Sequence, residues 1–295
     1  MKIHLIINPS SGKESGARSG TELADILSAR GHIVSRSYTE KKGDGTAFAI
    51  DAGKRGAELI VACGGDGTVN EVVHGMAQAE ERLPIAIYAQ GTVNDFATQL
   101  QLPLEAEAFA DMIDRNKRMV LDVGRMNDRT FLNVAAFGAV SKIGHEVDVE
   151  AKTMLGRLAY VIEGIRTAPD LLNIPMPMRI TMDTGEVAEG DFLFAGIANS
   201  RSVGGFSHFA PRALVNDGLL DLIIIQRTDV VTLGQILMRL GSGEHIEHEG
   251  IAYYQASTFE VTAENETAID LDGEEAGVLP AKVQVLPAHL PCIIP

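Results

Sequence analysis

Apolar runs of strand length alternate with amphipathic stretches through the first 122 residues of the chain. Each short run rich in Val, Ile, Leu and Ala is followed by apolar residues at helical spacing. The pattern predicts strands at 3–7, 33–38, 57–62 and 84–88, and helices at 22–29, 47–55 and 69–77. Strands that alternate with helices in this way form a parallel sheet covered by helices. We therefore predict a three-layer α/β domain over residues 1–122.

The pattern changes after Asp122. Shorter, β-rich runs separated by turn residues predict antiparallel sheets stacked as a sandwich. Their positions are 131–136, 178–182, 190–198, 219–226, 257–262 and 267–271, and the apolar run 283–287 precedes a tail that contains prolines. Helices predicted at 153–167 and 229–240 each carry an apolar stripe, which we expect to pack on a sheet. The second predicted domain is β-rich and spans residues 123–285.

A glycine-rich turn follows the strand predicted at 57–62. Residues 64–68 read Gly-Gly-Asp-Gly-Thr and lead into a helix. We expect the glycines to allow positive φ and close approach of backbone N–H groups to a ligand, and a helix N-terminus favours anions. The Asp66 carboxylate would repel phosphate unless a cation lay between them. The turn therefore indicates a metal–nucleotide complex, with a tight ligand-free turn as the alternative; its spacing fits neither a Walker loop nor a dinucleotide fingerprint.

A second turn of this kind follows the next predicted strand. Residues 90–96 contain Gly91 and Thr92, with Asn94 and Asp95 at helix-capping positions, so capping and nucleotide binding both explain them. The loop at 8–13 follows the first strand and Thr39 follows the second. Because parallel strands present their carboxyl ends at one edge of the sheet, these segments should meet there.

Composition narrows the function further. A net charge of −15 argues against a nucleic-acid partner and against strong adsorption to an anionic membrane. The basic run 115–118 is more typical of a solvated helix end than of a docking patch. Cys63 and Cys292 are the only cysteines, which favours a reducing cytoplasm over a disulfide framework. No apolar run approaches the ~20 residues of a membrane span, and we expect a soluble protein.

Three motifs carry a family resemblance: 8–12 (Asn-Pro-Ser-Ser-Gly), 64–71 (Gly-Gly-Asp-Gly-Thr-Val-Asn-Glu) and 91–97 (Gly-Thr-Val-Asn-Asp-Phe-Ala). Their order and spacing resemble the soluble bacterial lipid kinases of the diacylglycerol kinase catalytic family, which is related to sphingosine kinases and NAD kinases. The third motif separates lipid kinases from NAD kinases. The resemblance implies an ATP cleft between the two domains, with nucleotide contacts from Asn8, Ser11, Gly12, Thr39, Gly64, Gly65, Asp66, Gly67, Thr68, Asn70, Glu71, Thr92, Asn94 and Asp95.

The resemblance also assigns a metal to the second domain. Residues 214–221 contain an Asp-Gly turn signal before a predicted strand. In the lipid-kinase pattern the matching aspartate, Asp217, binds a structural Mg²⁺ together with the backbone carbonyls of Leu214 and Leu219. Oxygen ligands of this kind suit a hard cation.

Residues 269–274 read Ile-Asp-Leu-Asp-Gly-Glu, and alone they predict a hairpin. In the resembling family, Asp-Gly-Glu near the C-terminus lines the catalytic cleft. Phosphoryl transfer requires a carboxylate to accept the proton of the acceptor hydroxyl, and Asp272 and Glu274 both remain candidates. His245 and His248 have a spacing seen in metal sites but lack a third ligand, so we expect polar loop histidines.

One departure from the family pattern is the run 137–140 (Phe-Gly-Ala-Val), where many lipid kinases have an aspartate. The likeness is therefore closer to the Gram-positive branch, and the acceptor stays open. The resemblance implies a cytoplasmic, Mg²⁺-dependent kinase that transfers phosphate from ATP to diacylglycerol. It also implies transient contact with the inner membrane face, a homodimer, and a tail, 286–295, that returns to the first domain. Other lipid acceptors (phosphatidylglycerol or a long-chain amino alcohol), an NAD kinase and a non-catalytic nucleotide-binding regulator are the alternatives.

Overall fold

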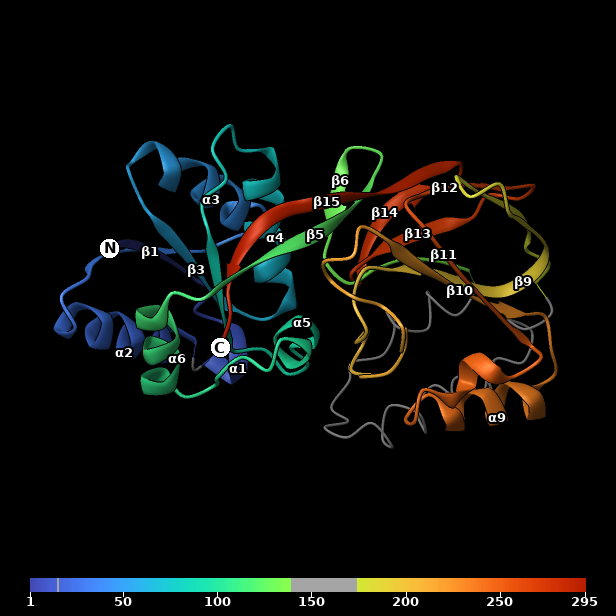
Figure 1. The fold of residues 1–295 in the computed structure, drawn as a ribbon, viewed down its shortest axis with the longest axis horizontal. Helices are drawn as coiled ribbons and strands as arrows, with labels where there is room; N and C mark the ends of the chain where they lie inside the picture. The colour runs from blue at the N-terminus through green and yellow to red at the C-terminus, as the bar shows by residue number, and fades with distance from the viewer. Residues whose placement is uncertain (15, 139–173) are drawn as a thin grey trace. The chain divides into compact units, whose positions relative to one another are not determined.

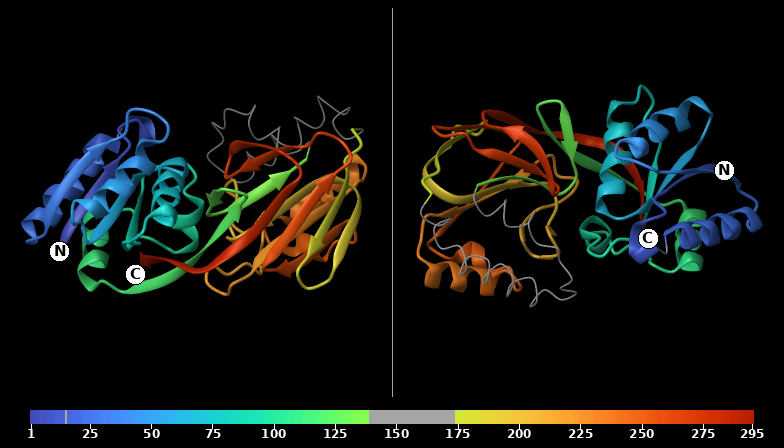
Figure 2. Two further views of the ribbon diagram at one scale, coloured as in Figure 1. Left: turned by 90° about the horizontal axis from the view of Figure 1, so that it is seen from above. Right: turned by 180° about the vertical axis from the view of Figure 1, so that it is seen from behind.

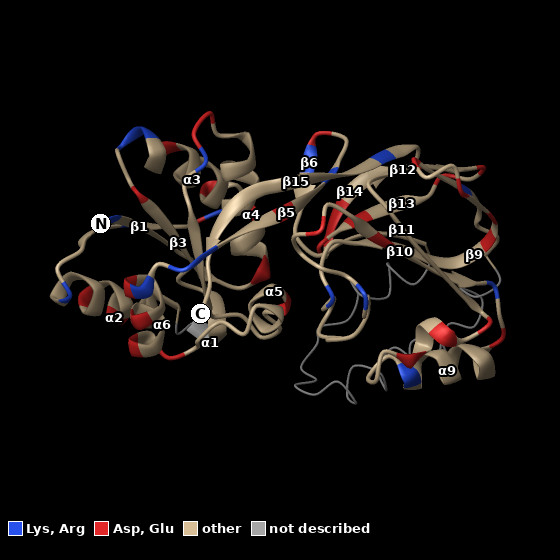
Figure 3. Cartoon of the chain, in the orientation of Figure 1, with Lys and Arg blue, Asp and Glu red and all other residues tan. Residues whose placement is uncertain are grey.

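The computed structural model describes residues 1–14, 16–138 and 174–295 (Figure 1). The chain forms two compact units, Met1–Val123 with Pro287–Pro295, and Gly124–Leu286. Cys63 and Cys292 are buried free thiols. Within the described residues, the helices are all too short or too polar to cross a membrane. Over the part of the chain that the structure describes, Lys and Arg positions are spread over many separate elements instead of lining one helix or strand (Figure 3).

The first unit is built on a parallel sheet, as the sequence predicts. Its strand order is β2 (Ile33–Tyr38), β1 (Lys2–Ile7), β3 (Leu59–Gly64) and β4 (Ile85–Ala89), and every residue of β3 is buried. The helices pack in two pairs that cover the two faces of the sheet (Figures 1 and 2). One pair is α2 (Gly16–Ala29) with α6 (Ala106–Arg115); the other is α3 (Asp44–Lys54) with α4 (Asp66–Gln78).

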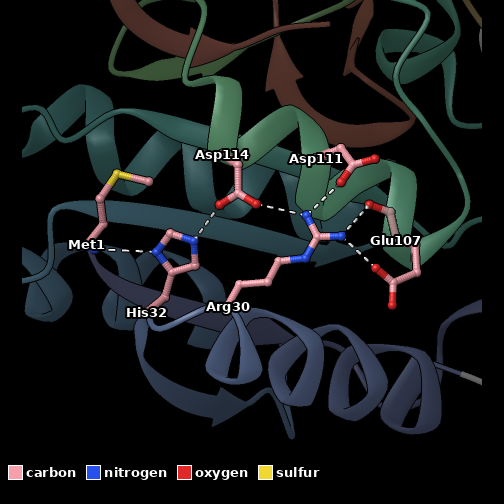
Figure 4. A network of polar contacts seen from close by, with 6 residues as sticks. All are labelled: Met1, Arg30, His32, Glu107, Asp111 and Asp114. Carbon is pink, nitrogen blue, oxygen red and sulfur yellow. Dashed lines mark hydrogen bonds and ion pairs between the residues drawn. The ribbon is translucent and has the colours of Figure 1, made fainter.

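An ionic cluster joins the helices of the first pair. Arg30, just after α2, contacts carboxylate oxygens of Glu107, Asp111 and Asp114 on α6 at 2.6, 2.7 and 2.8 Å (Figure 4). His32 Nε2 lies 2.8 Å from the second oxygen of Asp114. These hydrogen bonds raise the pKa of Arg30 and lower the pKa of Asp114, whose partial burial acts in the opposite sense. The cluster therefore ties α2 to α6 outside the apolar core.

Two long strands carry the chain between the units. β5 (Arg118–Met126) leaves the first unit, and β15 (Ala281–Ile293) returns to it. In the first unit, Cys292 of β15 pairs with Ile85 of β4, and Ala288 N–H donates a 2.7 Å hydrogen bond to Asp122 Oδ1. The C-terminal residues are thus part of the first sheet, and the second unit is inserted between them and β5.

The second unit is a sandwich of antiparallel sheets, which confirms the predicted fold class. Strand β9 (Val187–Ala198) takes part in both sheets, because residues 187–191 pair with β8 (Pro177–Met182) and residues 192–198 pair with β10 (Leu220–Gln226). The other strands are β6 (Arg129–Phe131), β7 (Val134–Phe137), β11 (Ile251–Ala256), β12 (Thr258–Ala263), β13 (Ala268–Leu271) and β14 (Glu274–Val278). Phenylalanines fill the interior between the sheets: Phe131, Phe137, Phe192 and Phe259.

The outer face of β9 and β10 is covered by α9 (Val230–Arg239), which agrees with the helix predicted at 229–240. The Asp229 carboxylate begins this helix by accepting hydrogen bonds from the N–H groups of Val231 and Thr232. The helix predicted at 153–167 lies outside the described residues. Sequence patterns missed α6, β5 and β11, and the strand predicted at 57–62 is observed at Leu59–Gly64.

Candidate active site

The predicted nucleotide residues of the first unit gather where its parallel strands end. Asn8 N–H, after β1, donates to Cys63 O of β3 at 2.9 Å, and Gln90 N–H, after β4, donates to Gly64 O at 2.8 Å. Thr39 N–H, after β2, donates to Ile7 O at 2.9 Å. The four loops therefore start from adjacent positions on one edge of the sheet, as expected for a ligand site of an open α/β sheet.

The loop after β1 is fixed by the Asn8 side chain. Asn8 Nδ2 donates to Thr68 Oγ1 of α4 at 3.1 Å, and Asn8 Oδ1 accepts the Ser10 N–H at 3.0 Å. Ser11 Oγ donates to Asn8 O at 2.9 Å, and Gly12 has a φ of 59°, a left-handed conformation that suits glycine. The hydrogen bond between Asn8 and Thr68 thus holds the first motif, 8–12, against the second motif, 64–71.

The glycines of the second motif are required for close approach. A Cβ atom on Gly64 would lie 2.5 Å from Thr68 Oγ1, and a Cβ on Gly91 would lie 2.7 Å from the Cα of Gly65. The two loops therefore touch through backbone atoms. The expectation of positive φ at Gly64, Gly65 and Gly67 was wrong, because none of them adopts it. Steric clearance between the loops accounts for Gly65 and Gly91, and clearance from the Thr68 side chain of the same motif accounts for Gly64. A Cβ on Gly67 would meet nothing within 4 Å.

Asp66 links the two glycine turns. Its Oδ2 accepts the Asn94 N–H at 2.9 Å, and the Asn94 side chain closes onto Gly91 with two 2.8 Å hydrogen bonds to backbone N–H and C=O groups. Asn94 itself has a φ of 55°. Burial, and then the charge of the buried Asp95, raise the pKa of Asp66 to about 6. Because two carboxylates share this region, a bound cation would relieve their repulsion.

The last two residues of the second motif differ in their surroundings. Both Glu71 carboxylate oxygens accept backbone N–H groups, from Gly43 and from Gly45, at 2.8 Å each, and Glu71 O accepts Thr46 Oγ1 at 2.9 Å. Glu71 therefore holds the start of α3. Asn70 Oδ1, in contrast, is buried and has no hydrogen-bond partner among the described residues.

In the second unit, Asp272 occupies the tight turn between β13 and β14. Asp272 has a φ of 51° and Gly273 a φ of 88°, as a two-residue hairpin turn requires. The Asp272 carboxylate accepts three backbone N–H groups, from Leu132 to Oδ2 at 2.8 Å, and from Asn133 and Val134 to Oδ1 at 2.9 and 2.7 Å. The side chain is therefore fixed against the segment before β7.

Glu274, the first residue of β14, is partly solvent-accessible and contacts an arginine. Arg129 Nη2 lies 3.3 Å from Glu274 Oε2, and 37% of the Glu274 side chain is solvent-accessible. Arg129 also donates to Glu275 O at 2.8 Å, so the arginine is anchored on the backbone of the same strand. Glu274 thus presents its carboxylate on the hairpin that Asp272 positions.

Sequence patterns missed a buried polar group that supports this arrangement. Ser200 Oγ donates to Asn133 Oδ1 at 2.8 Å, and Asn199 Nδ2 donates to Leu132 O at 3.0 Å. All three side chains, Asn133, Asn199 and Ser200, are at most 5% exposed. In the sequence, these three residues are marked only as polar positions that interrupt or end apolar runs. That pattern does not show which residues they bond to.

The predicted metal turn contains an acidic pair. Asp217 is exposed, and its Oδ1 accepts the Leu219 N–H at 3.0 Å. Asp221, in β10, is only 1% exposed and was not predicted as a site residue. Burial raises the pKa of Asp221 to about 6, with hydrogen bonds from Tyr253 and Gln255 acting against this and the Asp217 charge adding to it. Leu214, the remaining predicted ligand residue, has an exposed side chain, and its proposed donor is the backbone carbonyl.

The two histidines serve the loop around the 3₁₀ helix Glu244–Glu247. His245 is buried with Nε2 2.9 Å from Phe209 O, and burial lowers its pKa. His248 Nδ1 accepts the Gly250 N–H at 3.0 Å. Within the described part of the chain, no group of three or more His, Cys, Asp or Glu side chains is arranged to hold a metal ion. Any cation site here must therefore use backbone oxygens, water or ligand atoms as well.

The chain matches two family models that together cover nearly all of it. Residues 2–126 match the diacylglycerol kinase catalytic domain, and residues 133–294 match the YegS C-terminal NAD kinase beta sandwich-like domain. A diacylglycerol kinase of Staphylococcus carnosus is 34% identical over 294 residues, which is 100% of this chain and 95% of that protein. A diacylglycerol kinase of Staphylococcus haemolyticus is 35% identical over 291 residues, 99% of this chain and 87% of that protein.

Solved structures show the same likeness. The chain is 25% identical to a diacylglycerol kinase of Bacillus anthracis with a TM-score of 0.78, covering 100% of this chain and 97% of that one. A further Bacillus anthracis crystal structure gives 29% identity and a TM-score of 0.85, covering 100% and 95% of the two chains. An Archaeoglobus fulgidus NAD kinase in complex with ATP shares the fold, with a TM-score of 0.54 at 14% identity over 99% of this chain and 92% of that one.

Proposed function

Since the chain belongs to the diacylglycerol kinase family of lipid kinases, we propose that it transfers the γ-phosphoryl group of ATP to the hydroxyl group of diacylglycerol. The products are phosphatidic acid and ADP, and Mg²⁺ is the required cation. The observation that best supports this proposal is the link between the two glycine turns. Asp66, the first residue of α4, accepts a hydrogen bond from the Asn94 N–H of the other turn. That link brings a helix N-terminus, clearance for phosphate and a carboxylate to one edge of the sheet.

The nucleotide is bound mainly by the first unit. Backbone N–H groups at the start of α4 provide an anion site, and Gly64, Gly65 and Gly91 keep side chains away from it. Asn70 Oδ1 is a buried acceptor without a protein partner among the described residues, so it suits an amino or hydroxyl donor of the nucleotide. Glu71 acts through α3 and does not contact the nucleotide in this proposal.

The donor set fits Mg²⁺. Asp66 and Asp217 offer carboxylate oxygens, and the carbonyls of Leu214 and Leu219 add oxygen ligands at the second of these positions. When bound, Mg²⁺ neutralises the charge that develops on the transferred phosphoryl group. The raised pKa of Asp66 is consistent with a cation there, because a positive charge would stabilise the ionised carboxylate that burial and Asp95 disfavour.

We assign the proton acceptor to Glu274. Three N–H donors engage both oxygens of Asp272, so this carboxylate is best suited to positioning the hairpin. Glu274 contacts Arg129 at 3.3 Å, and its partly solvent-accessible side chain can be reached by an incoming hydroxyl. A carboxylate that accepts the proton of the attacking hydroxyl meets the requirement of phosphoryl transfer for a base.

The test is transfer of label from γ-labelled ATP to diacylglycerol, phosphatidylglycerol, a long-chain amino alcohol and NAD in mixed micelles with Mg²⁺. We expect label in phosphatidic acid. Glu274→Gln should lower kcat by about 10²–10⁴-fold with little change in the KM for ATP, because general-base assistance is lost. Asp272→Asn should lower kcat and thermal stability together. The matched control is Glu275→Gln, the exposed neighbour.

Other outcomes of this assay would contradict the proposal in different ways. Label in another lipid keeps the chemistry and corrects the acceptor, and label in NAD makes the chain an NAD kinase. ATP binding without transfer to any acceptor makes it a regulator. Full turnover in Glu274→Gln would return the base to Asp272. Because the acceptor resides in a bilayer, we also propose transient contact of a cytoplasmic protein with the inner membrane face, which co-sedimentation with lipid vesicles would measure.

A further inference from the structure

One short segment, residues 129–134, holds the hairpin of the proposed proton acceptor at two points. Three backbone N–H groups at the end of this segment donate to the Asp272 carboxylate in the turn. From the start of the segment, the Arg129 side chain reaches the next strand, β14. Its Nη1 donates to Glu275 O at 2.8 Å, and its Nη2 lies 3.3 Å from Glu274 Oε2. The Glu274 side chain therefore lies between the turn that Asp272 fixes and a contact that Arg129 provides.

The backbone position of Arg129 is fixed at both ends of strand β6. Before the strand, Asn127 N–H donates to Lys282 O of β15 at 3.0 Å, and Asn127 Oδ1 accepts the Lys282 N–H at 3.2 Å. At the end of the strand, Phe131 is buried in the core. Its ring occupies the space beside Gly124 of β5, where a Cβ atom would lie 2.2 Å from the ring. The guanidinium group of Arg129 therefore extends from a well-anchored strand.

Strand β14 depends on such a contact because it lies at the edge of its sheet. Among the strands that the structure describes, β14 pairs with β13 and is the last in the sheet order. An edge strand is hydrogen-bonded to a neighbouring strand on one side only. Arginine is a forked donor that can bind a backbone carbonyl and a carboxylate at the same time. Here the contact with Glu275 O holds the strand, and the contact with Glu274 Oε2 orients the carboxylate.

We propose that Arg129 is the positioning residue of the proton acceptor, which sets the orientation of the Glu274 carboxylate toward the attacking hydroxyl. The inference rests on the proposed function, which makes Glu274 the base. Catalytic side chains are commonly oriented by a further group in this way. A displacement of about 1 Å at such a group can cost on the order of 10²-fold in rate. Arg129 acts through Glu274 and does not contact the substrate in this proposal.

The length of the contact with Glu274 suits this role. A strong charge-assisted hydrogen bond between a guanidinium and a carboxylate is about 2.7–2.9 Å long. At 3.3 Å the contact between Arg129 and Glu274 is weaker, and the two side chains are 41% and 37% exposed. The carboxylate can therefore adjust by a small amount when it accepts a proton. Meanwhile the 2.8 Å hydrogen bond to Glu275 O keeps the strand in place.

The alternative is that Arg129 only contributes to the fold, as a surface ion pair does. Such pairs contribute little to stability. Arg179 provides the matched control in the same unit, because its guanidinium pairs with Glu189 across strands β8 and β9 and both side chains are exposed. Arg179→Met thus removes a cross-strand ion pair of the same type from a different pair of strands.

The first test is the kinetics of label transfer from γ-labelled ATP to diacylglycerol in mixed micelles. Arg129→Met should lower kcat by about 10–100-fold, with the KM for ATP within about twofold of wild type. Arg129→Lys keeps the charge but cannot bind both acceptors, so it should recover only part of kcat. Arg179→Met should keep the wild-type kcat. The unfolding midpoints of Arg129→Met and Arg179→Met should be similar, because each variant loses one exposed pair.

A double-mutant cycle tests whether Arg129 acts through Glu274. In the Glu274→Gln background, Arg129→Met should lower kcat by less than about twofold further, because the group that Arg129 positions is already absent. Two losses that multiply in the double variant would show that Arg129 acts independently of Glu274, and would overturn the inference. Full turnover in Glu274→Gln would also overturn it, because Glu274 would then not be the base, while transfer to diacylglycerol itself would stand.

Hydrogen exchange supplies a measurement that does not depend on turnover. If Arg129 holds β14, the backbone amides of 273–278 should exchange faster in Arg129→Met than in the wild type, and at the wild-type rate in Arg179→Met. Unchanged exchange in Arg129→Met would overturn the inference. A wild type that transfers label to no acceptor would contradict the proposed function itself, and the exchange rates would then still show whether Arg129 holds the strand.

Discussion

Ser200 Oγ donates a 2.8 Å hydrogen bond to Asn133 Oδ1, between two side chains that the fold buries completely or nearly so. The same Asn133 donates its backbone N–H to the Asp272 carboxylate at 2.9 Å. Ser200 is therefore connected, through one intervening residue, to the hairpin that carries Asp272 and the proposed base. Because buried polar groups resist displacement, this chain of hydrogen bonds fixes the segment that in turn fixes Asp272.

Ser200→Ala should lower kcat about tenfold while the KM for ATP stays within twofold. The substitution leaves the buried Asn133 Oδ1 without its donor, which costs roughly 1–3 kcal/mol and loosens the segment that carries the N–H donors to Asp272. Steady-state kinetics and thermal unfolding measure both effects. Ser207→Ala is the control, because the Ser207 side chain bonds to the adjacent His208 and to no other residue that the structure describes. Unchanged kcat in a destabilised Ser200→Ala would reduce Ser200 to a purely structural residue.

Gly91→Ala should weaken ATP binding by separating the two glycine turns. The new Cβ would lie 2.7 Å from both Gly65 Cα and Asn94 Oδ1, so a backbone segment must move. Overpacking of this kind typically costs about 1–3 kcal/mol, and we expect a comparable loss in ATP affinity, up to about 100-fold. Gly67→Ala should keep wild-type stability in the same unfolding experiment, because its Cβ would meet no atom within 4 Å. Wild-type ATP affinity in Gly91→Ala would contradict the close-contact argument.

Asp66→Asn should stabilise the protein at pH 8 and abolish phosphoryl transfer. The folded-state pKa of Asp66 is raised to about 6 by burial and by Asp95, above its ordinary value of 3.8. Asp66 therefore ionises at a lower pH in the unfolded chain than in the folded protein. The free energy of unfolding falls as the pH rises from about 4 to 6, and above pH 6 the loss is up to about 3 kcal/mol. The asparagine variant lacks this loss.

The measurement for Asp66 is the difference in unfolding midpoint between variant and wild type. It should be small at pH 4 and reach its maximum above pH 6. Saturating Mg²⁺ and ATP should make this difference smaller. The bound cation stabilises the ionised Asp66 carboxylate of the wild type, and the asparagine variant lacks that carboxylate. A difference that does not depend on pH would show that Asp66 is not the group responsible.

The sequence was sufficient to predict the fold class and the meeting of the first-unit loops at one edge of the sheet, because those signals are local. Strand runs, helical spacing and the two glycine turns each lie within about ten residues, and the parallel order brings the turns to one edge. The reason given for the glycines was wrong, since the clash at Gly91 comes from Gly65, on a different strand end. The residue pattern within one segment carries no information about the distance between Gly91 and Gly65.

Contacts between residues far apart in the sequence could not be predicted, because a local pattern carries no information about such partners. Ser200 and Asn133 are 67 positions apart, and Asp272 reaches donors about 140 positions earlier in the chain. Asp221 was read as part of an apolar strand, because nothing near it in the sequence indicates that Tyr253 and Gln255 hold only one of its oxygens. Such pairings depend on strand register, which the hydrophobic pattern fixes only once the sheets are known.

Glu71→Ala distinguishes between two roles for Glu71, which are support for the start of α3 and contact with the nucleotide. Both carboxylate oxygens accept N–H groups at the start of α3, from Gly43 and Gly45, where a negative charge also favours the helix dipole. Losing these bonds should destabilise the chain by about 1–3 kcal/mol, with the KM for ATP within twofold of wild type. Thermal unfolding and ATP titration measure this, with the exposed Glu81→Ala as control. A large rise in KM at unchanged stability would instead make Glu71 a nucleotide contact, and would require its side chain to leave α3 when ATP binds.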